Sequence, residues 1–263
     1  METTGENIIQ VKKERSYISC LVKGCGYGFK NLGMLLRYIW PSLVLAILLP
    51  IPFIFFFAAQ MDAILRKWTA LGYVPNVKLK AMKRDIELCA NRSAFKVLIY
   101  MLWMGIALVG LYAPFFIGIK IWWGLVFFFL VWLLPLPLSV VIMQVSYSDN
   151  KIKDCLRSGF RIGYRNYGKL FAFEFLSNLL QVIIVLMGAL PLIVLQCARA
   201  QALRSIMMGD ATVLPVSFYL YVILGSFIYW TVAYITLLVF SFSRCLMWGS
   251  LVNEVPAETE ANS

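Results

Sequence analysis

LFAFEFLSNLLQVIIVLMGALPLIVL, residues 170–195, is a long apolar run in which Glu174 is the one charged side chain. A helix needs about 20 apolar residues, at about 1.5 Å rise per residue, to cross roughly 30 Å of hydrocarbon. Four further runs are long enough for one crossing each: 38–59, 97–119, 121–145 and 217–243. The sequence therefore predicts about five membrane segments.

Charged residues are kept out of these runs. Of the 263 residues, 61% are hydrophobic and 14% charged, whereas about 25% are charged in a typical soluble domain. All 24 Lys and Arg lie outside the five runs, and Glu174 is the one acid inside them. Lipid offers backbone groups no hydrogen-bond partner, and continuous apolarity without alternation favours helices over barrel strands. We expect an all-α fold, a polytopic transmembrane helical bundle.

A glycine-rich pattern, G-x3-G-[FY]-[KR]-N-x-G-x-L, occurs twice at an offset of 135 residues. The first copy contains Gly24, Gly28, Phe29, Lys30, Asn31, Gly33 and Leu35. The second contains Gly159, Gly163, Tyr164, Arg165, Asn166, Gly168 and Leu170. Glycine and asparagine are hard to match by chance in a chain dominated by Leu, Ile and Phe. We expect a single integral membrane domain, 1–263, with repeat 1 at about 15–145, repeat 2 at about 150–252, and a disordered acidic tail at 253–263.

Basic residues recur every four positions before the fourth run. They are Lys153, Arg157, Arg161, Arg165 and Lys169. This spacing predicts an amphipathic helix lying on the membrane surface, and similar basic stretches precede the first run and follow Pro75. Each cation near an anionic surface contributes about 1 kcal/mol, so we expect these five to bind anionic lipid. The alternative is an ordinary solvated face.

The stretch CLRSGFRIGYRNYGKL, residues 155–170, follows a proline-containing apolar run. It resembles an element of uncharacterised bacterial multi-pass inner-membrane proteins, and is similar to the membrane domain that accompanies some glycerophosphoryl diester phosphodiesterases. The resemblance covers about residues 15–245. It implies a bacterial inner-membrane helical bundle and brings no site residue, and this sequence shows no soluble phosphodiesterase domain.

Three polar residues share one face of the fourth run. Glu174, Asn178 and Gln181 are spaced at i, i+4 and i+7, so a helix places them together. Exposing them to lipid is costly, which predicts an intramembrane polar site facing protein or water. One interpretation is hydrogen bonding between helices, and the other is a path for an ion or substrate.

The residue types argue against an enzyme. The chain has no histidine, and its six cysteines form no CxxC pair, so zinc sites and Ser-His or Cys-His catalysis are disfavoured. We expect no catalytic site, no metal and no cofactor. The net charge of +11 is better explained by membrane orientation and lipid contact than by nucleic acid.

The distribution of basic residues leaves the first run ambiguous. The positive-inside rule places the basic loops 60–96 and 146–169 in the cytoplasm. The N-terminal tail is also basic, and a single crossing by 38–59 puts it outside. If 38–59 instead enters and returns, bending at Pro50 and Pro52, the tail stays inside; we favour this arrangement.

Two functions remain in competition. The first is a non-enzymatic protein that organises or senses the inner membrane through anionic lipid and a membrane-protein partner. The alternative is a small transporter or lipid-handling protein with a site between the repeats, near Pro50, Pro135, Asn178 and Gln181. A closed, well-packed bundle favours the first function, whereas a polar cavity at mid-depth favours the second.

Overall fold

The computed structural model describes residues 11, 13, 15–48, 50–74, 83–117, 122–124, 126–127, 136–148, 151–209 and 215–253. In this part of the chain all regular secondary structure is helical, in agreement with the predicted all-α class. The predicted acidic tail, apart from Asn253, lies outside the described residues.

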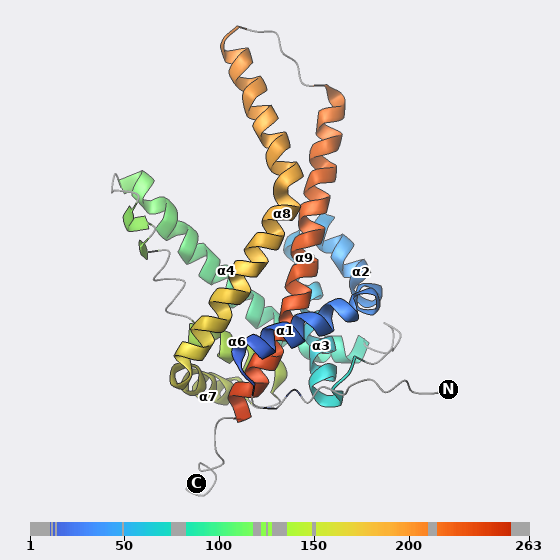
Figure 1. The fold of residues 1–263 in the computed structure, drawn as a ribbon, viewed down its shortest axis with the longest axis vertical. Helices are drawn as coiled ribbons and strands as arrows, with labels where there is room; N and C mark the ends of the chain where they lie inside the picture. The colour runs from blue at the N-terminus through green and yellow to red at the C-terminus, as the bar shows by residue number, and fades with distance from the viewer. Residues whose placement is uncertain are drawn as a thin grey trace, which may run out of the picture.

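Two long helices form a hairpin that rises away from the other elements (Figure 1). They are α8, Tyr167–Met207, and α9, Val216–Asn253. Both are long and apolar enough to cross a membrane, and they expose most of their most apolar stretch. No other helix in the described residues meets these criteria. A bundle of five segments therefore remains a prediction.

The first apolar run is divided between two helices that fold back on each other. Helix α2, Leu32–Leu48, ends just before α3, Pro50–Leu71. The Ser42 hydroxyl hydrogen-bonds to the Gln60 side chain, 18 residues along the chain. In one continuous helix these residues would lie about 27 Å apart, so the chain reverses between them. Residues 38–59 do not form one straight crossing.

A proline stands at the reversal. Pro50 is the first residue of α3, where its missing N–H costs no helical hydrogen bond. Pro52 also lies at this helix start, whereas Pro135 falls outside the described residues.

Helix α4, Lys83–Ile117, packs against α3. Asp62 of α3 is buried, accepts a hydrogen bond of 2.6 Å from Ser93 Oγ and pairs with Lys96 Nζ. Nearer the start of α4, Lys67 Nζ lies 2.7 Å from Asp85 Oδ2. The basic stretch after Pro75 lies outside the described residues until α4 begins.

Two short helices, α1 and α7, each lie against another helix through glycine. Helix α1, Tyr17–Lys30, crosses α9, and α7, Ile152–Arg165, crosses α6, Leu136–Tyr147 (Figure 1). A methyl group on Gly159 would lie 2.7 Å from the Val141 Cα. Backbones this close leave no room for a side chain, so glycine is required.

The same crossing is found in both places. A methyl group on Gly24 would overlap the backbone of Ser243, and one on Gly28 would lie 3.1 Å from the Val239 Cα. On α7 the matching contacts are Gly159 with Val141 and Gly163 with Pro137. The contacted residues of α6 and α9 differ in number by 102 in both pairs. Both crossings are antiparallel, with the same four-residue step.

The ends of α1 and α7 also match at the offset of 135. Asn31 and Asn166 cap the two helices, and their side-chain amides donate to Tyr27 O and Ile162 O, four residues earlier. Asn166 leads directly into α8, as Asn31 leads into α2. Leu35 and Leu170 follow, and both are fully buried.

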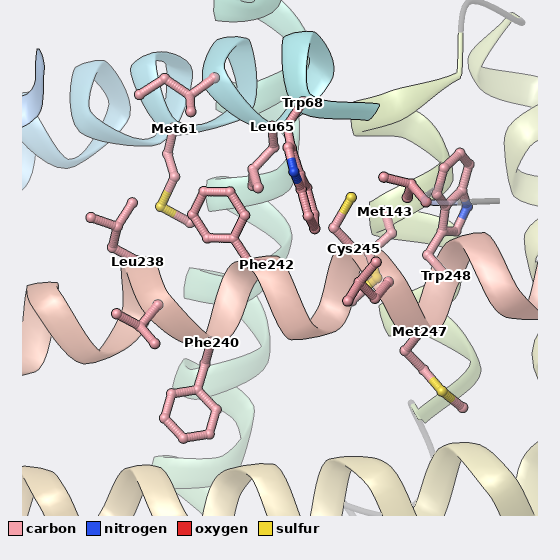
Figure 2. Close-up of a cluster of buried hydrophobic side chains, with 14 of the residues drawn as sticks. Met61, Leu65, Trp68, Met143, Leu238, Phe240, Phe242, Cys245, Met247 and Trp248 are labelled. Atoms are coloured by element: carbon pink, nitrogen blue, oxygen red, sulfur yellow. The ribbon is translucent and has the colours of Figure 1, made fainter. Parts of the chain in front are cut away.

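Aromatic side chains fill the core between α1, α3 and α9 (Figure 2). Trp68 stacks on Tyr27 with 5.0 Å between ring centroids and meets Phe242 edge-on at 4.8 Å. Such buried aromatic pairs stabilise by about 0.5–1.5 kcal/mol beyond the area they bury. This core fixes the half of α9 that carries Ser243 and Arg244.

Candidate functional site

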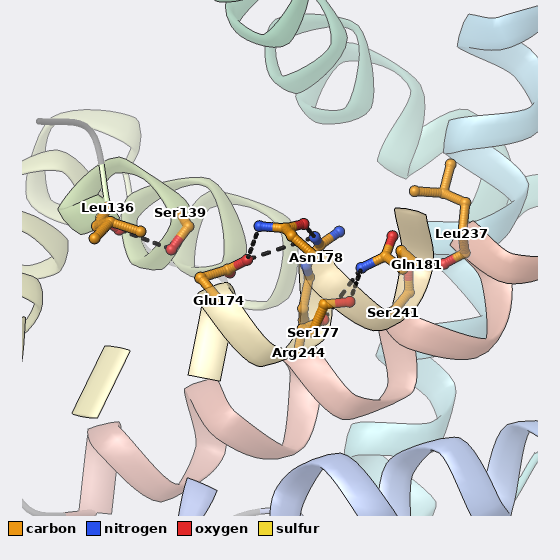
Figure 3. Close-up of polar contacts among 9 residues, drawn as sticks. All are labelled: Leu136, Ser139, Glu174, Ser177, Asn178, Gln181, Leu237, Ser241 and Arg244. Carbon is orange, nitrogen blue, oxygen red and sulfur yellow. Dashed lines mark hydrogen bonds and ion pairs between the residues drawn. The ribbon is translucent and has the colours of Figure 1, made fainter. Parts of the chain in front are cut away.

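An ion pair joins α8 to α9 (Figure 3). Arg244 Nη2 lies 3.5 Å from Glu174 Oε2 and donates to Asn178 Oδ1 at 3.1 Å. Asn178 Nδ2 also faces Glu174 Oε2, at 3.4 Å. Glu174 is 5% exposed, and the Arg244 side chain is 18% exposed. Glu174 and Asn178 of the predicted polar face thus meet Arg244, which lies just outside the apolar run 217–243.

Gln181 stands apart from this cluster. Its side-chain amide donates to Ser177 Oγ at 3.1 Å, within its own helix. Like Asn178, it is half-buried on the side of α8 that faces protein rather than among the exposed apolar side chains. The structure therefore brings together Glu174, Asn178 and Arg244, and leaves Gln181 beside them.

A cavity of about 380 Å³ lies between α3, α4, α6 and α9. Its walls are mostly apolar, with Ala58 and Met143 among them. Among the described residues that line it, the charged ones are Lys96 and Arg244, and both are cations. This volume falls within the usual range of ligand pockets, which combine apolar walls with a few polar groups.

A second cavity, of about 250 Å³, adjoins the first. It is lined by Glu174 and Asn178 as well as Arg244, and by Ser139 of α6. Arg244, with Tyr100 and Ile142, borders both cavities. Arg244 therefore lines both cavities, of which the smaller also contains Glu174 and Asn178.

Two buried polar atoms at the larger cavity have no hydrogen-bond partner among the described residues. They are Arg244 Nε and the hydroxyl oxygen of Ser146. Ser146 is 3% exposed, and its side chain lines the cavity. A buried polar group without a partner costs about 1–3 kcal/mol, so native structures rarely leave one unpaired. The described residues therefore leave the hydrogen-bonding capacity of these two atoms unfilled.

Sequence reasoning missed Lys96 and Arg244. Lys96 directly precedes the apolar run 97–119, and Arg244 directly follows the run 217–243. Charges at the ends of such runs are expected to face the membrane surface. A signal was present for Arg244, because apolar residues continue after it through Leu246, Met247 and Trp248. A single cation with apolar sequence on both sides indicates a buried role.

The five basic residues predicted to bind lipid are all exposed. Lys153, Arg157, Arg161 and Arg165 lie on α7, and Lys169 lies in the first turn of α8. Phe160 and Tyr164 are also exposed on α7 and stack with 6.3 Å between ring centroids. The buried face of α7 is the glycine face that meets α6.

The two cysteines on α1, Cys20 and Cys25, do not resemble reactive thiols. Burial raises the pKa of Cys20 to about 11, although Arg15 and Lys23 act to lower it. Burial also raises the pKa of Cys25, against the lowering effect of its contact with Ser243. A raised thiol pKa keeps the group protonated at neutral pH and therefore unreactive.

The described residues contain no group of three or more His, Cys, Asp or Glu placed to hold a metal ion. Searches of protein-family models, curated proteins and solved structures return no match to this chain. The fold and site thus define an all-helical protein with two helices able to span a membrane and a cation-bearing cavity beside them. The resemblance to bacterial multi-pass proteins remains a prediction.

Proposed function

We propose that this chain is a non-enzymatic, multi-pass protein of the bacterial inner membrane that binds and handles lipid. The observation that carries the proposal is the cavity of about 380 Å³, whose apolar walls meet two cations. An amphiphile matches both features, because its chain contacts apolar walls while its head accepts hydrogen bonds. The lipid-handling interpretation placed its site between the halves near Pro50, Pro135, Asn178 and Gln181; among the described ones, Asn178 lines the smaller cavity and none lines the larger.

Exposed apolar surface supports the membrane placement. Leu186, Met187 and Val194 of α8 are each more than half exposed, as are Leu220 and Ile223 of α9. Water-soluble proteins rarely expose such continuous apolar surface, whereas lipid covers it without cost. Helix α8 has 41 residues and spans about 60 Å, so it extends beyond the hydrocarbon.

The opening of the cavity suggests how lipid enters. Tyr100 and Met101 of α4 and Leu237 of α9 line the cavity and are exposed. These side chains are apolar or amphipathic, so the opening suits a bilayer better than water. We infer that an acyl chain enters sideways from the membrane, between α4 and α9.

We also infer that the chain is an internal duplication, with halves at about 15–145 and 150–252. The matching caps at Asn31 and Asn166 and the matching glycine crossings support this. Each half begins with a short helix that lies on the last helix of the other half: α1 on α9, and α7 on α6. The cavity lies between the halves, as in duplicated membrane proteins that bind a substrate at the repeat interface.

In a second candidate function, the protein organises the membrane surface through contacts with anionic lipid and with a membrane-protein partner. The exposed basic and aromatic residues of α7 favour it. The two functions are compatible, because a surface helix on anionic head groups holds the cavity opening at the bilayer.

Lipid retention tests the lipid-handling proposal. The full-length protein is extracted in mild detergent, and the lipid bound per protein is measured by native mass spectrometry. Ala58 lines the cavity, so Ala58→Phe fills part of it, and Met101→Trp narrows its opening. Ala200→Leu adds apolar volume at an exposed position of α8 as a matched control.

We expect the wild-type protein and Ala200→Leu to retain lipid, and the two cavity variants to lose at least about half of it. Met101 is exposed, so Met101→Trp tests the opening without disturbing the core. Equal retention by all four proteins, or no retained lipid in the wild type, overturns the proposal.

A further inference from the structure

We propose that the cavity selects an acidic lipid, and that Arg244 and Lys96 bind its anionic head group. This inference rests on the proposed function and specifies its ligand. The ligand class is an acyl lipid with a phosphate or carboxylate head, such as phosphatidylglycerol or a fatty acid.

Charge is the first argument. The charged side chains that line the larger cavity, within the described residues, are Lys96 and Arg244. Their counterions lie behind them: Asp62 accepts from Ser93 and pairs with Lys96, and Glu174 lines the smaller cavity. A head group in the larger cavity therefore meets two cations without an intervening carboxylate, which favours an anion.

The unfilled bonding capacity of Arg244 is the second argument. A charge-assisted N–H···O bond is usually about 2.7–2.9 Å long, whereas the Arg244–Glu174 contact is 3.5 Å. Arg244 Nε is buried and has no partner in the described residues. A guanidinium group binds phosphate or carboxylate with two parallel bonds, so it retains capacity for a second anion.

Ser146 supplies a third, independent argument. Its hydroxyl is buried and has no partner in the described part of the chain, and Ser146 is one of the residues that line the same cavity. An anionic oxygen accepts a hydrogen bond from a hydroxyl as readily as from an N–H. The three groups come from three helices: Lys96 from α4, Ser146 from α6 and Arg244 from α9. All three residues line the same cavity, and we place the head group among them.

The two halves of the chain suggest the variant that tests the site. At the offset of 135, Glu174 of α8 corresponds to Ile39 of α2, and at the offset of 102, Arg244 of α9 corresponds to Ile142 of α6. The double variant Glu174→Ile/Arg244→Ile therefore places the residues of the first half in the second. It removes the cation and its counterion together and leaves neither charge buried alone.

The experiment measures the binding of defined lipids to delipidated full-length protein in neutral detergent. Dioleoyl phosphatidylglycerol, dioleoyl phosphatidylcholine and oleate are added singly, and bound lipid is read by native mass spectrometry. Inorganic phosphate alone distinguishes a free anion from a lipid head. Lys151→Gln removes an exposed cation at the start of α7, outside the five predicted to bind lipid, as a control for surface binding.

We expect the wild-type protein to bind phosphatidylglycerol and oleate about tenfold more tightly than phosphatidylcholine. In the double isoleucine variant this ratio falls to about two or less, and in the α7 control it is unchanged. Ser146→Ala, which keeps both charges and the fold, lowers phosphatidylglycerol affinity a few-fold. Inorganic phosphate alone neither binds measurably nor competes.

Three outcomes overturn the inference: equal binding of acidic and zwitterionic lipid, a ratio that survives in both the double variant and Ser146→Ala, or a ratio that disappears only in the α7 control. If phosphatidylcholine binds equally well and Ala58→Phe prevents it, the lipid-handling function stands while head-group selection fails. If no lipid binds at all, both fail.

Discussion

The crossing of α1 with α9 and the crossing of α7 with α6 have the same geometry but different chemistry. In both, two glycines four residues apart face the backbone of an antiparallel helix. On α6 the positions near the crossing are Val141 and Ile142, both buried and apolar. On α9 the corresponding positions are Ser243 and Arg244.

The polar residues of α9 make specific contacts. Ser243 Oγ donates to Leu21 O at 3.1 Å and lies 3.2 Å from Cys25 Sγ, whereas Arg244 faces Glu174. The crossing of α7 with α6 shows that apolar side chains suffice for packing at these positions. Packing alone therefore does not require the polar residues of α9.

Substitution of Arg244 is expected to give the largest change in unfolding free energy. Arg244→Ile alone leaves Glu174 buried without a counterion, so we expect unfolding free energy to fall by about 3 kcal/mol. Arg244→Ile with Glu174→Ile restores the residue types of the first half, and we expect it to regain most of that loss. Thermal unfolding in detergent, followed by the exposure of buried cysteines, measures both.

The pair of variants also serves as its own control. If the double variant is as unstable as the single one, the ion pair is needed for the fold, and the two halves are less equivalent than their geometry suggests. The Arg204→Ile variant, which changes an exposed cation of α8, is expected to unfold like the wild type.

The glycine crossings give the next largest effect. Gly24→Ala and Gly159→Ala each force two backbones apart, and we expect each to lower unfolding free energy by about 2 kcal/mol. Gly33 and Gly168 are matched controls, because an added methyl group meets no described atom within 4 Å. Alanine there has no effect or stabilises by up to about 1 kcal/mol.

Unequal effects of Gly24→Ala and Gly159→Ala on stability would show that the two crossings are not equivalent. If Gly24→Ala destabilises and Gly159→Ala does not, only the first crossing supports the fold, and the common geometry carries little energy in the second. The same thermal unfolding assay gives this result directly.

The outer faces of the two short helices give the smallest effect. The outer face of α7 carries Arg157, Arg161 and Arg165, whereas α1 exposes Lys23 and Lys30. Replacing Arg161 alone by Gln should weaken binding of a peptide of residues 150–168 to vesicles of anionic lipid about fivefold, at about 1 kcal/mol per charge. Equal binding to purely zwitterionic vesicles, or no change in the variant, identifies the α7 cations as an ordinary solvated face.

Much of the fold could be predicted because helix formation depends on residues that are close along the chain. The apolar run at 170–195 requires a helix in lipid, and the structure contains that helix within α8. The exposed positions of the basic residues on α7 likewise follow from helical periodicity alone. The Ser42–Gln60 contact shows that the chain reverses near Pro50, as the favoured of the two arrangements requires, while the side of the membrane on which the N-terminal tail lies remains a prediction.

Only the part of the candidate site that lies on α8 could be predicted from the sequence. Periodicity placed Glu174 and Asn178 on one face of a helix, because residues four apart share a face whatever surrounds them. Arg244 lies 70 residues from Glu174, and no local pattern joins them.

The sequence by itself determined the helical class, the apolar helices α8 and α9 and the polar face of α8, since these depend on neighbours along the chain. The tertiary structure alone decided that Arg244 meets that face and that a cation-lined cavity adjoins it. Contacts between distant segments depend on how helices pack, and packing is set by shape and volume summed over many side chains. For the same reason the glycines were visible as a repeated pattern, while their function as crossing points became clear only from the backbones they touch.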